Sequence, residues 1–278
     1  MIFFFFDLDD KMTILYAGLF FGLLFIRNKN LGNQMKSIAV VCDVMKNEFT
    51  MYKNKADNNL ECIFLEQHLH NTPNIMNKRL QEVIDGIEGD YDNILLGYGL
   101  CSNGVVNLKS EKYEIIIPRV DDCISLFLGS KEKYLEEFKK DPATYYLCRG
   151  WIEYGGDPYR GYLLWTGQED KIPGSWLNNR KVYGQRYDRK MAEFLFVEII
   201  KNYKQVTLID NNDLEEIHIR FAGDMVDLMS KMLNREVKLK IIKGSLELLS
   251  RLAQCRFDEK NFLKIKRGEK ILQQHFFK

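Results

Sequence analysis

The chain has 278 residues, of which 46% are hydrophobic and 28% are charged, so it has the composition of an ordinary folded protein and enough length for a substantial core. Its 40 Lys and Arg residues nearly balance 39 Asp and Glu residues, and a net charge of +1 argues against a nucleic-acid partner. The six cysteines show no CxxC pair and no regular spacing, which indicates a reducing, cytoplasmic setting.

Residues 1–34 form an apolar N-terminal extension. Its uncharged stretch, residues 12–26, is shorter than the roughly 20 residues that cross a bilayer core. The acidic flank before it is wrong for a secretory signal, whose leading region is basic. Three interpretations stay open: translation begins at Met35, the stretch anchors the chain to a membrane with the domain on the cytoplasmic side, or it packs as a helix on the domain.

From residue 35 onward, short apolar runs alternate with amphipathic segments. This alternation is typical of βαβ units, so we expect residues 35–278 to form one α/β domain with an open, mostly parallel sheet and helices on both faces. The expected strands are 37–41, 61–65, 93–97, 113–118, 205–209 and 237–242, and the expected helices are 77–87, 189–203, 214–233 and 244–252.

Residues 141–183 interrupt this pattern. They contain all three tryptophans, several tyrosines and the pair Gly155-Gly156, with little periodicity. We interpret the segment as an aromatic-rich insertion. A long loop of this kind is typical of a lid or a binding loop, and a surface for docking a partner is the alternative.

Chemically useful side chains follow several of the expected strands. Cys42, His70, Cys101 and Cys123 each come just after an apolar run, with His68 close to His70. Open α/β sheets bind ligands outside the carboxyl ends of their strands, and thiolates and imidazoles suit zinc or iron. We therefore predict that His70, Cys101 and Cys123 bind a metal ion and leave one position open. The alternative is that these side chains are structural, because buried thiols are common core residues.

The segment GYGLCSNG places Cys101 in a glycine-rich loop after a strand. It matches neither nucleotide-binding fingerprint, so a phosphate cradle is a weak interpretation. Instead, we expect Gly97, Gly99, Asn103 and Gly104 to let a ligand approach the backbone while the loop presents Cys101 as an exposed, activated thiol.

Two charged residues near the fourth expected strand complete the predicted site. Asp122 can orient a ligand or act as a catalytic base beside Cys101, although it is also well placed to cap the helix that begins near Cys123. Arg119 is a candidate anchor for an anion, and an ordinary salt bridge is the alternative.

The motifs LHNTP, LGYGLCSNG, IPRVDDCISLFLGS and YYLCRGW resemble an uncharacterised domain-of-unknown-function family of anaerobic bacteria and methanogenic archaea. The similarity runs from about Met35 to Ile271. The resemblance implies an association with corrinoid methyl-transfer systems, and hence a corrinoid cofactor and a corrinoid protein or methyltransferase as partner.

Two functions of different classes remain open. The first is a metal- or cofactor-site protein, with an enzyme of methyl or one-carbon transfer as its most concrete form, in which a Cys/Cys/His site activates a thiol. The second is a non-enzymatic accessory protein that binds a small molecule or a corrinoid. The sequence identifies neither the substrate nor the reaction.

Overall fold

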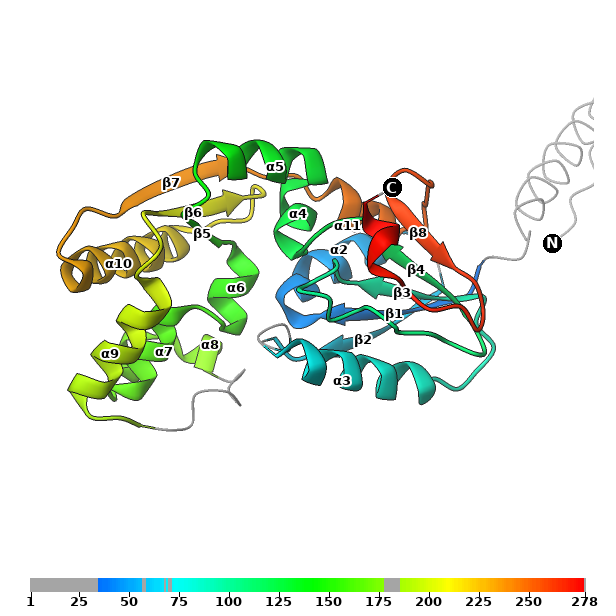
Figure 1. The fold of residues 1–278 in the computed structure, drawn as a ribbon, viewed down its shortest axis with the longest axis horizontal. Coiled ribbons are helices and arrows are strands. Elements are labelled where there is room, and N and C mark those ends of the chain that lie inside the picture. Colours follow the sequence, from blue (N-terminus) through cyan, green and yellow to red (C-terminus); the bar gives the residue numbers. More distant parts are fainter. Residues whose placement is uncertain (1–34, 57–58, 68, 70–71, 178–185, 278) are drawn as a thin grey trace, which may run out of the picture. The chain divides into compact units, whose positions relative to one another are not determined.

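The computed structural model describes residues 35–56, 59–67, 69, 72–177 and 186–277 (Figure 1). Lys36–Lys278 forms one compact unit. Within the described ranges, no helix is both long enough and apolar enough to cross a membrane. The apolar stretch at residues 12–26 lies outside them.

The first sheet carries the expected strand ends. Its strand order is β2-β1-β3-β4-β8, with β1 to β4 parallel and β8 antiparallel to β4. The chain runs from β1 outward to β2 and then returns to β3 on the other side, so the strand order reverses between β1 and β3. The strands are β1 (Ser37–Cys42), β2 (Leu60–Leu65), β3 (Asn93–Gly97), β4 (Glu114–Pro118) and β8 (Phe262–Ile265).

Helices cover both faces of this sheet. The connection from β1 to β2 and the connection from β2 to β3 run in opposite directions, and right-handed crossovers then place their helices on opposite faces. Both central strands are buried along their whole length, as expected of a covered parallel sheet. The helical segments of this part are η1 (Asp43–Met45), α2 (Lys46–Lys55), α3 (Pro73–Asp85), α4 (Cys123–Leu128), α5 (Lys131–Lys140), α11 (Glu247–Ala253) and η4 (Gln273–Phe276).

The other strands form a second sheet with the order β5-β6-β7, all parallel. The α/β class and the mostly parallel pairing are thus confirmed, but the strands expected at 205–209 and 237–242 do not join the first sheet. Its elements are β5 (Thr144–Leu147), α6 (Arg149–Tyr154), α7 (Pro158–Trp165), η3 (Glu169–Lys171), α8 (Gly174–Leu177), α9 (Arg189–Ile200), β6 (Gln205–Asp210), α10 (Glu216–Leu233) and β7 (Lys238–Lys243).

The expectation of an irregular loop at 141–183 is wrong. The segment begins with β5, which pairs with β6, and continues through several short helices. Helix α7 buries seven of its eight residues, so its sequence shows no alternation of apolar and polar faces. Tyr159, Tyr162 and Trp176 are core residues of the second sheet. Tyr145, Tyr146 and Trp151 line the site described next.

Candidate functional site

Three cysteines meet at the carboxyl edge of the first sheet. Cys42 ends β1, Cys101 follows β3, and Cys123 begins the helix after β4. All three border one small cavity of about 20 Å³, together with Tyr98. The cavity lies where the strand order reverses, which is the place where open α/β sheets bind ligands.

Gly99 explains how Cys101 comes close to Cys123. A methyl group at Gly99 would lie 2.8 Å from the backbone nitrogen of Asp122, so only glycine permits the two segments to approach. The backbone N–H groups of residues 100 and 101 donate to the carbonyl oxygens of residues 120 and 121, both at 2.9 Å. These bonds continue the pairing of the β3 and β4 segments beyond the strands themselves.

The loop after β3 is held in an unfavourable backbone conformation. Cys101, Ser102 and Asn103 have φ angles of 47°, 55° and 69°, and each left-handed residue with a side chain costs about 1–2 kcal/mol. The side-chain amide of Asn77 stabilises the loop by donating to the carbonyl oxygens of residues 104 and 106, at 3.1 and 2.7 Å. Conformations of this kind persist where the surroundings enforce them, and they cluster at functional sites.

A larger cavity of about 380 Å³ opens next to the thiols, and we call it the thiol–aromatic cavity. Its volume lies within the range of roughly 300–1,000 Å³ that is usual for small-molecule sites. Four aromatic side chains between residues 145 and 203 line it together with Cys101 and Cys123. The residues that border the cavity and enter the argument below are Gln67, Cys101, Asp121, Asp122, Cys123, Tyr145, Tyr146, Trp151 and Tyr203.

Gln67 is the residue of this cavity that points most directly to a ligand. Its side chain is only 5% exposed, yet among the residues that the structure describes neither the amide nitrogen nor the amide oxygen has a hydrogen-bond partner. A buried polar group without a partner costs roughly 1–3 kcal/mol. Because Gln67 borders the thiol–aromatic cavity, a ligand there is well placed to supply the missing donor and acceptor.

Burial controls the state of the thiols. It raises the pKa of both Cys42 and Cys101 to about 12, and for Cys101 the nearby Asp122 carboxylate adds to the effect. Burial also raises the pKa of Cys123 well above its usual value, and the charge of Cys101 is the next largest cause of this rise. Cys101 is only 7% exposed, so the expectation of an exposed, activated thiol is wrong.

Asp122 has the capping role foreseen for it, and its role as a catalytic base stays a prediction. Its Oδ1 accepts a hydrogen bond from the backbone N–H of Ser125 at 3.2 Å and so caps α4. Burial raises the pKa of this carboxyl to about 6, close to neutrality. The neighbouring Asp121 instead pairs with Lys131 at 3.2 Å. Asp122 is therefore the carboxyl of the cavity that is able to exchange a proton near neutral pH.

Other predicted site residues lie elsewhere or have a packing role. The Arg119 guanidinium donates to the carbonyl oxygens of His275 and Glu259 at 3.0 and 3.1 Å and borders a different cavity, so the structure does not bring it to the thiols. Asn103 is exposed. Gly97 and Gly104 leave room for Val41 and Met76, respectively, so these glycines are explained without a ligand.

The predicted metal site is only partly covered by the structure. His68 and His70 lie outside the described residues. Among the residues that the structure does describe, no three Cys, His, Asp or Glu side chains are arranged to hold a metal ion. The placed thiols alone therefore do not form a metal centre, and ligation with His70 stays a prediction.

Residues 64–252 match the model of a family described as "Protein of unknown function (DUF1638)". The chain belongs to this family. The expected membership of an uncharacterised family is thus confirmed, whereas the link to corrinoid chemistry stays a prediction. No curated protein and no solved structure matches the chain. The matched range includes Gln67, Cys101, Cys123 and the aromatic wall of the cavity, but not Cys42.

Proposed function

We propose that this protein binds a small polar molecule in the thiol–aromatic cavity. The observation that carries the proposal is the buried amide of Gln67, a residue that borders the cavity and whose two polar side-chain atoms have no hydrogen-bond partner among the described residues. Since buried polar groups in folded proteins are nearly always hydrogen-bonded, an unpaired amide at a cavity wall favours a ligand with a matching acceptor and donor.

The cavity favours a particular class of ligand. A glutamine amide presents one acceptor and one donor side by side, which matches a carboxamide, a carboxylic acid or a lactam. Trp151 and Tyr146 offer apolar surface for a planar group. At about 380 Å³ the cavity is at the small end of ligand sites, so a corrin macrocycle would enter only in part.

The neutral thiols also bear on function. Without a nearby cation, Cys101 and Cys123 remain protonated at neutral pH, because burial disfavours their thiolates. Non-enzymatic binding is therefore the function that the arrangement favours. An accessory protein that only binds a ligand needs no thiolate and no chemical reaction at this site.

An enzyme is the second candidate, favoured by the convergence of three thiols on one cavity. A thiophilic cation such as zinc or iron, held by Cys101, Cys123 and the predicted ligand His70, would stabilise the thiolates and make one of them a nucleophile. Methyl or one-carbon transfer, with a corrinoid protein as partner, belongs to this candidate. Asp122 would then be the proton acceptor beside the thiols.

The binding proposal is tested with Gln67→Met, which keeps the length of the side chain and removes its amide. We expect benzamide, a carboxamide probe, to bind the wild-type protein in a ligand-observed NMR titration and to lose affinity in the variant. The same substitution should raise the free energy of unfolding of the ligand-free protein by about 1 kcal/mol, because it removes two unsatisfied buried atoms.

Gln81→Met is the matched control. The Gln81 amide is already hydrogen-bonded to Asp85 and to the backbone of Lys109. This variant should lose stability and keep probe binding. If Gln67→Met binds benzamide as well as the wild type, or is the less stable of the two variants, the binding proposal is wrong.

Metal analysis tests the second candidate. Protein purified without oxygen should contain stoichiometric zinc or iron, and Cys123→Ser should lose it. Cys62→Ser is the control, because Cys62 lies in β2 and borders neither cavity at the sheet edge. Wild-type protein free of metal would eliminate the Cys/Cys/His centre and leave the binding proposal unaffected.

A further inference from the structure

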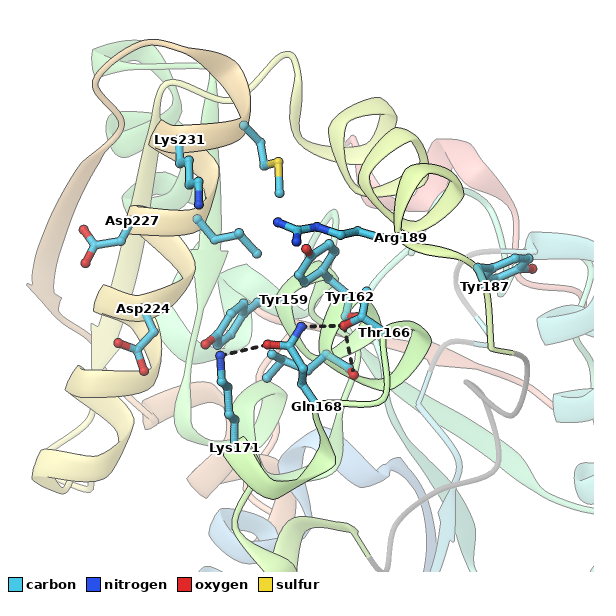
Figure 2. A pocket seen from close by; sticks show the side chains of 13 residues that line it. Tyr159, Tyr162, Thr166, Gln168, Lys171, Tyr187, Arg189, Asp224, Asp227 and Lys231 are labelled. Atoms are coloured by element: carbon cyan, nitrogen blue, oxygen red, sulfur yellow. Dashed lines mark hydrogen bonds between the residues drawn. The ribbon is translucent and has the colours of Figure 1, made fainter.

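A second large cavity, of about 790 Å³, lies among the helices of the second sheet (Figure 2). Helices α7 and α10 form two of its walls, and η3 and the start of α9 complete it. We call it the α7–α10 cavity. Its apolar floor includes Leu163, Leu228 and Met232, and its polar groups include Tyr159, Tyr162, Gln168, Lys171, Arg189 and Lys231.

Cations from three separate elements converge on this cavity. Lys171 comes from η3, Arg189 begins α9, and Lys231 lies in the last turn of α10. Figure 2 shows Arg189 extending from α9 toward the interior, whereas Asp224 and Asp227 extend away from it and Lys231 lies along α10 at the rim. The described lining residues therefore carry a net positive charge, with three cations and two carboxylates.

Lys231 is the most informative of these cations. It lies four residues after Asp227 on α10, a spacing at which oppositely charged side chains commonly pair. No ion pair joins the two, and within the described residues the side-chain ammonium of Lys231 has no hydrogen-bond or ion-pair partner. Its exposed side chain borders the cavity instead. The charge of Lys231 is therefore available for a ligand.

The other two cations contact polar side chains that an anion is able to replace, and Arg189 contacts the Tyr162 hydroxyl as well as Glu193. Arg189 pairs with Glu193 at 2.8 Å on an exposed surface, and Lys171 donates to the side chain of Gln168 at 2.8 Å. Exposed pairs of this kind contribute little free energy, typically about 0–1 kcal/mol. The N-terminus of α9 is not part of the argument, because Asp188 already caps it.

Two buried tyrosines add neutral donors. Burial raises the pKa of Tyr159 to about 12, with a further contribution from Asp224, and burial also raises the pKa of Tyr162. Both hydroxyls therefore keep their protons at neutral pH and are able to donate hydrogen bonds. The rings lie beside the apolar floor, so charged and apolar recognition are available within one cavity.

We propose that the α7–α10 cavity binds a small organic anion, in which a phosphate or carboxylate group is attached to an aromatic or aliphatic body. Lys231 and Arg189 bind the anionic group, and the apolar body rests on Leu163, Leu228 and Met232. This site is separate from the thiol–aromatic cavity and shares no lining residue with it.

Phenyl phosphate and benzoate are suitable probes, because each joins an anionic group to an aromatic ring. Calorimetric titration of the full chain should show binding of at least one of them, and the affinity should fall as ionic strength rises. Inorganic phosphate should bind more weakly than phenyl phosphate, since it cannot use the apolar floor. Absence of binding by both aromatic anions at millimolar concentration would overturn the proposal.

Lys231→Met removes the positive charge at the rim of the cavity and keeps the length of the side chain. We expect the affinity for the bound probe to fall about tenfold or more, as for loss of a charge-assisted hydrogen bond. Lys190→Met is the matched control, because Lys190 is an exposed lysine beside Arg189 that does not line the cavity. Equal affinity of the two variants would mean that the probe binds elsewhere and would also overturn the proposal.

Discussion

The buried thiols give the candidate site its chemical character. Raising the pKa of Cys101 from the usual 9.0 to about 12 lowers its thiolate fraction near neutral pH about a thousandfold. We therefore predict that iodoacetamide modifies Cys101 far more slowly than it modifies glutathione at pH 7.5. Because the thiolate is the reacting species, the rate should keep rising up to pH 10, which peptide mapping by mass spectrometry can follow. A rate that levels off near pH 9 would contradict the assignment.

Glu48 provides a second prediction about a single residue. It is 5% exposed, and burial raises its pKa from 4.5 to about 7, with repulsion from Asp213 as a further cause. The folded protein therefore holds the proton more tightly than the unfolded chain does. The contribution of the Glu48 carboxyl to the free energy of unfolding is fully present below pH 4.5 and is lost as the pH rises through about 7.

Glu48→Gln removes the buried charge, so it should raise the free energy of unfolding at pH 8 by about 1–3 kcal/mol. The gain should fade as the pH falls toward 5. Urea denaturation at both pH values measures it, and Glu88→Gln, at an exposed position, is the control. A gain that is equal at pH 5 and pH 8 would show that Glu48 is not the titrating group.

At the scale of elements, periodicity predicted the long and regular parts and missed the short ones. The strands that begin at Ser37 and Asn93 read as continuous apolar runs, and α10 has a clear apolar face. By contrast, β5 and β8 have four residues each, which is too short for a pattern of alternation. Helix α7 is apolar on nearly every side, so its sequence does not distinguish a helix from an aromatic loop.

The same reasoning explains which parts of the site were predictable. Carboxyl ends of parallel strands share one edge, so the meeting of Cys42, Cys101 and Cys123 follows from recognising the strands. Tyr146 reaches the cavity from the second sheet, and no local pattern in the sequence indicates that arrangement. The unpaired amide of Gln67 is likewise a property of its surroundings and not of its position in the chain.

Two substitutions of Asp122 distinguish its role as the cap of α4 from the role of its charge. Asp122→Asn keeps an oxygen acceptor for the Ser125 N–H, whereas Asp122→Ala removes it. We expect the alanine variant to be less stable than the asparagine variant by about 1 kcal/mol. Thermal unfolding of both variants at pH 8 makes the comparison. If Asp122 also transfers a proton, both variants lose that activity, but the asparagine variant keeps its fold.

At the scale of the whole unit, close polar contacts connect the elements of the two sheets. Glu153 of α6 accepts a hydrogen bond from the side chain of Asn47 at 3.1 Å through Oε2, and its Oε1 lies 3.1 Å from Nε2 of His218 on α10. Arg149 pairs with the same carboxylate at 2.7 Å. Glu153 thus links α2, α6 and α10. These contacts favour unfolding of Lys36–Lys278 as one cooperative unit.

Gly150 is the residue at which this connection is tightest. It lies in α6, and a methyl group there would overlap the backbone carbonyl oxygen of Val44, which cannot turn aside as a flexible side chain would. Gly150→Ala should therefore lower the free energy of unfolding by about 1–3 kcal/mol or more through overpacking.

Gly223 on α10 is the opposite case, because nothing lies within 4 Å of a methyl group placed there. Gly223→Ala should raise stability by about 0.5–1 kcal/mol through helix propensity. Urea denaturation of the two variants measures both effects, and a Gly150→Ala protein as stable as the wild type would show that α6 does not pack against Val44 as described.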